Sequence, residues 1–318
     1  MDHKRMKDFA TAASAGTALL LAIFSAGCQT DACTARGRYE GPASRTAPRH
    51  VIVVGFDGLA GYAVTNSPAP TMRRMMNEGA WTLRSRSILP SSSALNWHSF
   101  FTCSASEQTG VVDWFARKPK FTPSELTERG RYPDVFSEFR RIRPEAEIGL
   151  FYEWGGIPHL LDTNACSMVS VASPEADDVA RICDYITRRK PDFLAICLND
   201  PDHVGHAKGW GSPEYKARVH TLDDALARVL EAIDRAGMTD ETVVMLFSDH
   251  GGIGKKHGGP TLAEMERPSF LLGKGVKKGH EFDCSGAIYD DGATLAALLG
   301  IVDPPASWIG RPRHDAFR

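Results

Sequence analysis

Short apolar runs alternate along this chain with segments in which apolar residues recur at helical spacing. Apolar runs bounded by turn residues are typical of buried strands, and they occur at residues 50–56, 82–89, 148–152, 193–198, 243–247 and 269–272. Helical spacing, with capping Ser, Thr or Pro at the start and Gly at the end, predicts helices. These are expected at residues 71–78, from 91–93 onward, and at 133–141, 173–189, 212–236 and 291–299.

Several of the predicted strands are apolar throughout instead of alternating, as in the run HVIVVGF at residues 50–56. A strand of this kind is buried on both faces, as in a parallel sheet covered by helices. Strands that alternate with helices predict a mostly parallel central sheet between two helical layers, a three-layer α/β/α sandwich. The sequence has no internal repeat and no linker after residue 49. We therefore expect residues 50–318 to form one domain.

The first 49 residues have a different character. Basic residues precede an apolar, alanine-rich run at residues 10–27, which is the layout of a secretory signal. The run ends at Cys28, so residues 1–28 resemble a bacterial lipoprotein signal, in which that cysteine is lipidated. Ser25 departs from this pattern, where a Leu is usual, so ordinary signal cleavage is the alternative. The polar segment 29–49 is expected to be a flexible tether. Both alternatives predict export, to a bacterial periplasm or outer cell envelope, with membrane contact only through the lipid at Cys28.

Composition narrows the possible partners and leaves the cysteines open. Among 318 residues, 42% are hydrophobic and 24% charged, and the net charge is −2. Because there is no basic excess, a nucleic-acid polymer is not an expected partner, although a free nucleotide remains possible. There are seven cysteines and no CxxC pair. The six other than Cys28 are compatible with disulfides of undetermined pairing, but Cys197, in an apolar strand, is expected to be a buried thiol.

The strongest chemical signal is the stretch VVMLFSDHGGIGKKHGG at residues 243–259. An apolar strand leads directly to Asp249 and His250, and His257 follows after a glycine-containing turn. Carboxylate and imidazole are good ligands for Zn²⁺, and glycines let the backbone turn sharply. The stretch indicates a metal site, with a polar loop holding incidental histidines as the alternative.

Two further stretches supply the same residue types after other strands. Asp57 follows the first strand in GFDG, where Asp-Gly alone is more often a turn. In NDPDHVGH, residues 199–206, Asp202 and His206 are four residues apart and would face the same way on a helical turn, whereas His203 would point elsewhere. The alternative for this stretch is a solvated loop.

A serine cluster completes the set. In PSSSALN, residues 90–96, a hydroxyl near a helix start would lie among backbone N–H donors that can hold a phosphate. Such clusters alone are more often caps. Open α/β sheets bind ligands at the carboxyl ends of their strands, so the three carboxylates and three histidines can form two metal sites there. A hydroxyl beside one metal would be activated as a nucleophile for displacement at phosphorus.

Together these motifs resemble the alkaline phosphatase superfamily, and most closely its nucleotide pyrophosphatase/phosphodiesterase branch, over residues 50–302. The branch has a nucleophile motif, Thr-x-x-Asn, to which Ser93 and Asn96 correspond. The resemblance implies that Ser93 is the nucleophile and that Asn96 donates to a phosphate oxygen. Two positions depart from the branch: Trp97 replaces a His, and Trp114 stands where many relatives carry an Asn near the phosphate. We expect both tryptophans in the substrate pocket.

The resemblance also implies a division of the metal ligands. One metal would be held by Asp57, Asp249 and His250, next to the Ser93 hydroxyl, and the other by Asp202, His206 and His257. In the vertebrate nucleotide-hydrolysing enzymes the last ligand comes much later in the chain, so His280 and His314 are alternatives to His257. Mixed Asp and His sites suit two Zn²⁺ ions, with Mn²⁺ or Fe as possible occupants.

The sequence thus predicts an exported two-metal hydrolase of phosphate esters. The leading hypothesis is a phosphodiesterase or nucleotide pyrophosphatase that acts on a small phosphate ester or nucleotide through a phosphoseryl intermediate. A phosphomonoesterase on the same scaffold is the first alternative, and a non-catalytic metal-dependent surface binding protein is a remote one. A sulfatase is disfavoured because its Cys/Ser-x-Pro-x-Arg motif is absent around Ser93. Oligomeric state is left open.

Overall fold

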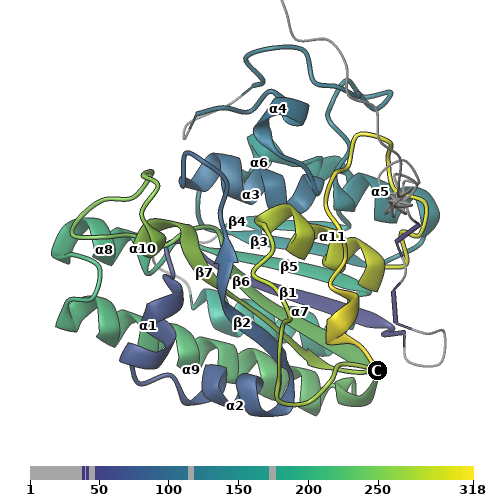
Figure 1. The fold of residues 1–318 in the computed structure, drawn as a ribbon. Helices are drawn as coiled ribbons and strands as arrows, with labels where there is room; N and C mark the ends of the chain where they lie inside the picture. The colour runs from purple at the N-terminus through teal and green to yellow at the C-terminus, as the bar shows by residue number, and fades with distance from the viewer. Residues whose placement is uncertain (1–37, 40, 43–46, 114–117, 172–176) are drawn as a thin grey trace, which may run out of the picture. The chain divides into compact units, whose positions relative to one another are not determined.

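An eight-stranded sheet runs through the described part of the chain, in the order β4-β3-β5-β1-β6-β7-β2-β8 (Figure 1). Each pair of neighbours is parallel except β6–β7 and β7–β2, so β7 alone runs against the others. The strands are β1 His50–Phe56, β2 Ala80–Arg86, β3 Ile148–Tyr152, β4 Met168–Val171, β5 Phe193–Leu198, β6 Thr242–Ser248, β7 Glu266–Gly273 and β8 His280–Glu281. This mostly parallel sheet confirms the predicted fold class.

The computed structural model describes residues 38–39, 41–42, 47–113, 118–171 and 177–318. The predicted signal peptide with Cys28, most of the predicted tether, and Trp114 lie outside these residues. Within the tether range, Tyr39 is buried: its hydroxyl donates to the Gly310 carbonyl at 2.9 Å, and its ring stacks on Trp308. The chain is therefore fixed to the folded unit at residue 39, ahead of the first strand.

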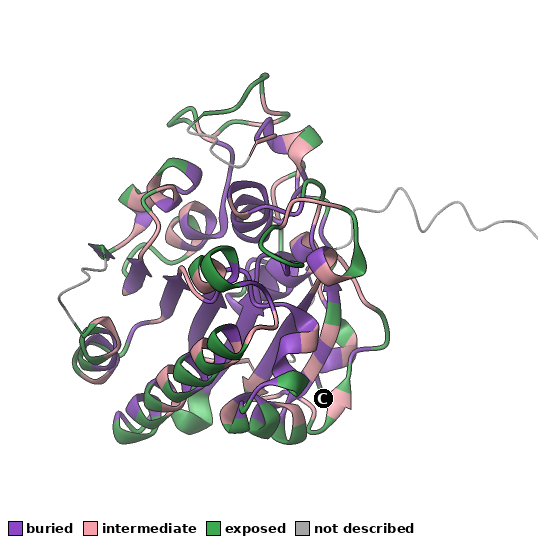
Figure 2. Ribbon diagram, turned by 90° about the vertical axis from the view of Figure 1, so that its left-hand side faces the viewer, coloured by how far each residue is buried: buried purple, intermediate pink, exposed green. Residues whose placement is uncertain are grey.

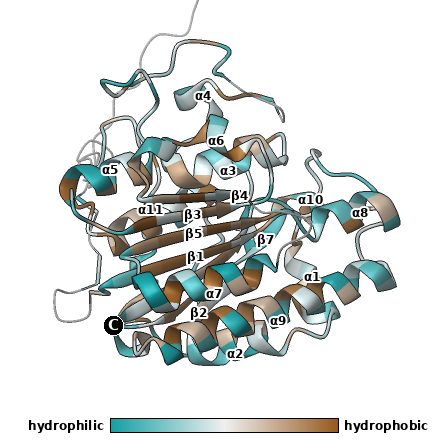
Figure 3. Cartoon of the chain, turned by 180° about the vertical axis from the view of Figure 1, so that it is seen from behind, coloured by the Kyte–Doolittle hydropathy of each residue, from teal (hydrophilic) through white to brown (hydrophobic). Residues whose placement is uncertain are grey.

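Helices cover both faces of the sheet. They are α1 Gly61–Asn66, α2 Pro70–Glu78, α3 Ser93–Thr102, α4 Ser106–Thr109, α5 Val135–Ile142, α6 Ile157–Leu160, α7 Asp178–Arg189, α8 Asp202–Lys208, α9 Pro213–Arg235, α10 Leu262–Met265 and α11 Ile288–Leu298. The described residues also contain three 3₁₀ turns, η2 Thr163–Ala165, η3 Thr239–Glu241 and η4 His314–Ala316. Seen from behind, brown apolar strands lie between helices with teal outer faces (Figure 3). None of the described helices is both long and apolar enough to span a membrane.

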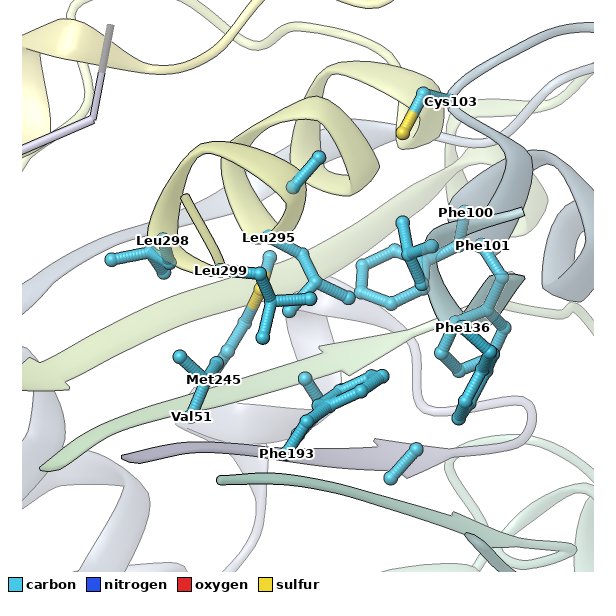
Figure 4. Packing of buried hydrophobic residues seen from close by; sticks show 14 of the residues in the cluster. Val51, Phe100, Phe101, Cys103, Phe136, Phe193, Met245, Leu295, Leu298 and Leu299 are labelled. Atoms are coloured by element: carbon cyan, nitrogen blue, oxygen red, sulfur yellow. The ribbon is translucent and has the colours of Figure 1, made fainter. Parts of the chain in front are cut away.

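Successive residues of the central strands pack on opposite sides and form two cores. Val51 and Val53 of β1 join one cluster with α3, α5 and α11, whereas Ile52 and Val54 join another with α1, α2, α7 and α9. In the first cluster, Phe100 and Phe101 of α3 lie beside Leu295 and Leu299 of α11, and Phe136 of α5 packs near Phe193 of β5 (Figure 4). Because both faces are covered, β1 is buried along its whole length (Figure 2), which explains its uninterrupted apolar sequence.

The predicted elements agree with the structure most closely at the central strands. β1, β3 and β5 have the predicted bounds, whereas β2 ends at Arg86 instead of residue 89. Thr71 does not cap α2, which starts at Pro70; the carboxylate of Asp223 accepts from the N–H groups of Thr71 and Met72, both at 2.8 Å. The short elements α1 and β4 were not predicted, and α8 was anticipated only as a helical turn that holds Asp202 and His206. The five described cysteines are free thiols, and Cys197 is buried as expected.

Candidate metal and catalytic site

Three carboxylates stand where neighbouring parallel strands end. Asp57 directly follows β1, Asp249 directly follows β6, and Asp202 begins α8 just after β5. The last residue of β1 is paired with the last residues of both β5 and β6. The three strands therefore end at one level, and their carboxylates meet at the same edge of the sheet, where open α/β folds place ligands.

The inner triad consists of Asp57, Asp249 and His250. All three are buried, and they offer ligand atoms within 4.8 Å of one another. His250 Nε2 lies 3.4 Å from Asp57 Oδ1 and 3.3 Å from Asp249 Oδ2. Nδ1 of His250 lies 2.8 Å from the Gly251 carbonyl, to which only a protonated nitrogen can donate. The other nitrogen, Nε2, is left with its lone pair directed at the two carboxylates, as a metal ligand requires.

The outer triad consists of Asp202, His206 and His257. Nε2 of His206 lies 3.5 Å from Asp202 Oδ2, and Nε2 of His257 lies 3.7 Å from Asp202 Oδ1. Both histidines again bond through Nδ1 to a backbone carbonyl, that of Lys255 at 3.0 Å and that of Ser91 at 2.9 Å. All three histidines of the two triads thus have the same fixed tautomer.

The two triads touch through their histidines. The rings of His250 and His257 are stacked with centroids 3.9 Å apart, and the His206 ring lies 5.0 Å from that of His257. One compact site therefore carries both groups of ligand atoms. The glycine-containing loop after β6 makes this possible, because it returns His257 to the edge that His250 has just left.

The electrostatics of the site show a shortage of positive charge. Burial, followed by the charges of Asp249 and Asp202, holds the pKa of Asp57 well above its usual range. Burial also raises the pKa of Asp249 to about 6, and it lowers the pKa of both His250 and His257. The imidazoles are therefore neutral at neutral pH and do not compensate the carboxylates.

Two buried carboxylate oxygens also indicate that a positive charge is missing from the site. Asp249 Oδ2 and Asp202 Oδ1, one in each triad, have no hydrogen-bond partner among the described residues. Buried acceptors without partners are rare and costly, and here each faces the Nε2 atom of a histidine. Carboxylate oxygens and neutral imidazole nitrogens form the donor set of Zn²⁺ and related ions. Both triads therefore fit a divalent cation.

A hydroxyl group stands beside the inner triad. Ser93 is the first residue of α3, and its Oγ lies 3.3 Å from Asp57 Oδ1 and 3.2 Å from His250 Nε2. The N-cap residue, Ser92, makes no side-chain cap bond. The first N–H groups of a helix have no intrahelical acceptor and attract anions. The start of α3 thus combines a nucleophile with donors suited to a phosphate oxygen.

A cavity of about 210 Å³ opens onto these groups. Its lining is formed by Asp57, Ser93, Trp154, Asn199, Asp202, His203, His206 and His257. The described residues that line it include no Lys or Arg. The ligand atoms, the hydroxyl and the space for a substrate are therefore contiguous.

The side chains of two predicted site residues do not line the cavity. Asn96 was expected to reach a phosphate, but it is completely buried; its Oδ1 accepts from the Ile88 N–H at 2.8 Å and its Nδ2 donates to the Ser92 carbonyl at 3.0 Å. Asn96 thus fastens the loop before the nucleophile. Trp97 was expected in the substrate pocket, but it is 1% exposed and donates from Nε1 to Asp57 Oδ2 at 3.0 Å. Trp114 lies outside the described residues.

Three cavity residues were not among the predicted site residues. Trp154 and Asn199 follow β3 and β5, so their position after apolar strands was the available signal. His203, expected to point away, also lines the cavity. Of the alternatives to His257, His280 belongs to a separate cluster with Asp283 and Asp315, and His314 begins η4. Among these histidines, only His257 is in the outer triad.

Comparison with known proteins places these motifs in a family. The family profile described as type I phosphodiesterase / nucleotide pyrophosphatase matches residues 51–257, which is more than half of the chain. Ectonucleotide pyrophosphatase/phosphodiesterase family member 1 of Mus musculus is 22% identical over 194 residues, covering 57% of this chain and 21% of that protein. The chain therefore spans about a fifth of the length of this relative.

Solved structures show the same fold. Murine ectonucleotide pyrophosphatase/phosphodiesterase 5, an inactive variant in complex with AMP, has a TM-score of 0.66 at 15% identity and covers 81% of this chain and 96% of its own. A 2-O glycosaminoglycan sulfatase has a TM-score of 0.65 at 14% identity, with coverage of 84% and 73%. The architecture is thus shared by phosphodiesterases and sulfatases, and the chemistry has to be argued from the site.

Proposed function

We propose that this chain, which belongs to the type I phosphodiesterase/nucleotide pyrophosphatase family of the alkaline phosphatase superfamily, hydrolyses phosphodiesters with two bound metal ions and Ser93 as nucleophile. The observation that carries the proposal is a serine hydroxyl that contacts one Asp/His triad and lines the same cavity as the other. A non-catalytic binding protein would not need that hydroxyl, because metal binding is already supplied by the triads.

The mechanism follows from the groups around Ser93. Asp57 Oδ1, which accepts a hydrogen bond from the hydroxyl, orients Oγ toward the cavity. Oγ forms a bond to phosphorus while the bond to the leaving oxygen breaks, and water then attacks the phosphoseryl group and restores the hydroxyl. The N–H groups of the first turn of α3 would hold a non-bridging oxygen. When bound, the ions would favour ionisation of the hydroxyl and stabilise charge on the attacking and leaving oxygens.

The lining of the cavity supports diesters over monoesters. A monoester carries an additional negative charge at neutral pH, and stabilising it requires cationic or strong donor groups near the phosphate. No Lys or Arg is found among the described lining residues, and Trp154 offers an aromatic surface instead. An aromatic surface suits stacking against a flat part of a substituent of the ester, such as the base of a nucleoside. The AMP bound by the murine relative is consistent with a nucleotide substrate.

Two further parts of the proposal concern the ions and the location. We assign both triads to Zn²⁺ because three Asp and His ligands with an open position suit this ion, with Mn²⁺ or Fe as alternatives. The basic and apolar start of the chain supports export, with lipid attachment at Cys28. Metal analysis of the purified protein and fractionation of the producing cells test these two assignments; a soluble cytoplasmic chain would contradict the second.

The test of the function compares Ser93→Ala with Ser93→Thr, which restores the residue usual in the branch. Rates are measured on the nitrophenyl diester of thymidine monophosphate and on nitrophenyl phosphate. We expect Ser93→Ala to lose roughly 10³-fold or more of its turnover with both metal ions retained, and Ser93→Thr to keep substantial activity. Wild-type rates in Ser93→Ala would refute the nucleophile. A faster rate on the monoester would favour a phosphomonoesterase.

A further inference from the structure

The indole of Trp97 reaches Asp57 from the interior of the protein. Trp97 is 1% exposed and is absent from the cavity lining, and its Nε1 donates to Asp57 Oδ2 at 3.0 Å. The other oxygen, Oδ1, accepts from the Ser93 hydroxyl and faces His250 Nε2. The carboxylate thus divides its two oxygens: one is bonded to the indole, and the other faces the site.

Both contacts come from one face of α3. Ser93 and Trp97 are four residues apart, and residues at this spacing lie above one another on the same side of a helix. The helix therefore presents a hydroxyl to Oδ1 and an indole N–H to Oδ2 of the same carboxylate. Any rotation of the Asp57 carboxylate would break the contact with Trp97 and change the position of the oxygen nearest to Ser93.

The indole itself is held in place by close packing. A Cβ atom at Gly55, the next-to-last residue of the apolar strand β1, would lie 2.4 Å from Cη2 of Trp97 and 2.8 Å from Phe247. Phe247 also packs edge-on against the indole with ring centroids 5.2 Å apart. The ring thus occupies the space that a side chain at position 55 would need, and it packs against both β1 and Phe247. The donor is fixed in the way that ligand-orienting groups need.

We propose that Trp97 is a positioning residue that fixes the Asp57 carboxylate, so that Oδ1 alone serves the inner triad and Ser93. This inference rests on the proposed function, since it concerns a metal at the inner triad. Asp249 is oriented differently: its Oδ1 accepts from the backbone N–H groups of Gly58 and His250. For Asp57 the indole replaces such backbone donors. Without it, Oδ2 would be a buried acceptor lacking this donor, and the carboxylate could rotate.

The experiment substitutes Trp97→Phe, which keeps an aromatic ring and removes the N–H. Metal affinity is measured by chelator competition in a His257→Ala background, where the inner triad is the remaining site. We expect the inner ion to bind about 10–100-fold more weakly, as for other groups that orient metal ligands, and the absorption spectrum of the Co²⁺-substituted protein to change. In the otherwise wild-type chain, kcat should fall by a similar factor while KM changes less than about twofold.

The matched control is Trp308→Phe. Trp308 is also buried, and its Nε1 donates to the Pro133 carbonyl at 3.1 Å, away from both triads. This variant loses the same kind of hydrogen bond, so it should lose comparable stability with chelator present while keeping the affinity for the inner ion. If Trp97→Phe merely loosens the fold, the two variants will show unchanged metal affinity, and the positioning role is wrong.

The results of these experiments distinguish a failure of the positioning role of Trp97 from a failure of the proposed phosphodiesterase function. If the wild type binds two ions and hydrolyses the diester, unchanged metal affinity in Trp97→Phe overturns the positioning role alone. If the wild type binds no metal, both the proposed function and the role of Trp97 fail. A Trp97→Phe chain that does not fold with chelator present, but whose Trp308→Phe counterpart does, would also contradict the proposal, because it would make Trp97 a packing residue.

Discussion

The inner and outer triads use the same residue types in different surroundings. Asp249 and His250 of the inner triad are completely buried. In the outer triad the His206 side chain is 47% exposed, and those of Asp202 and His257 are 13% and 14% exposed. The inner ligands follow two strand ends, whereas the outer ones come from the short helix α8 and from the loop after β6.

The difference shows which metal ligands the protein already holds in position before an ion binds. In the inner triad every ligand is oriented by a further hydrogen bond, from an indole, from backbone N–H groups or to a backbone carbonyl. In the outer triad both histidines are also bonded to backbone carbonyls, so the difference lies in the carboxylates. Asp249 Oδ2 and Asp202 Oδ1 both lack a partner among the described residues, but Asp249 is held through its Oδ1 by two backbone N–H groups, whereas no such bond among the described residues holds the Asp202 carboxylate. We infer that the inner triad fixes the nucleophile, while the outer triad, which forms much of the cavity wall, meets the leaving group and can adjust to it.

Asp249→Asn should have the largest effect, because it removes a ligand where the protein cannot readjust. Asn can keep the contacts of Oδ1 to Gly58 and His250, and its amide can donate to His250 Nε2, so the fold is retained. We expect loss of the inner ion and a fall in kcat of roughly 10³-fold or more, since a metal ion supplies several kcal/mol of stabilisation. Metal analysis and turnover measure both. Two ions in the variant would refute the inner assignment.

Without metal, Asp249→Asn should stabilise the folded state, although the same substitution lowers turnover when metal is present. Burial raises the pKa of Asp249 to about 6, so the folded state binds the proton more tightly than the unfolded state, and the free energy of unfolding decreases from about pH 4 to pH 6. Above that range the ionised group costs about 3 kcal/mol. In chelator at pH 7.5, Asp249→Asn should therefore unfold at a higher urea concentration than the wild type. A lower midpoint would contradict this cost.

The sequence predicted that Asp57, Asp249 and His250 lie together because they directly follow apolar strands. β1 and β6 are recognisable as buried strands, and parallel strands in register bring Asp57 and Asp249 together without further information. The helical spacing of Asp202 and His206 likewise corresponds to α8. His257 was uncertain because its place depends on the path of a loop, which spacing along the chain does not determine.

The roles of Asn96 and Trp97 could not be read from the sequence. Both lie on α3 next to the nucleophile, but a helix has several faces, and only packing decides which of them looks into the cavity. Trp97 turns toward the core, where Gly55 leaves room for its ring, and Asn96 turns toward the backbone of the preceding loop. Proximity to Ser93 in the sequence thus placed both residues near the site but did not give the direction of their side chains.

His257→Ala should have the second largest effect on turnover, and it tests directly whether the two triads bind separate ions. The variant removes one outer ligand and leaves the buried ligands intact, so we expect one bound ion instead of two and reduced, not abolished, turnover. His220→Ala is the matched control: His220 also bonds through Nδ1 to a backbone carbonyl, and its Nε2 lies 3.9 Å from a carboxylate, that of Asp224, on the surface of α9. It should keep two ions. Two ions in His257→Ala would place the third outer ligand elsewhere.

Brief treatment of the wild type with a chelator is the mildest perturbation, and it tests the comparison without any substitution. A chelator reaches the outer ion from the cavity, whereas the inner ion can leave only after buried ligands open. We expect two phases of metal loss, with one ion per chain remaining after the first. Activity should fall in the first phase and return on adding back one equivalent of metal. Simultaneous loss of both ions would show that the stacked rings of His250 and His257 couple the triads into one cooperative site. In that case burial would not separate the two positions, and the outer triad could not adjust independently of the inner one.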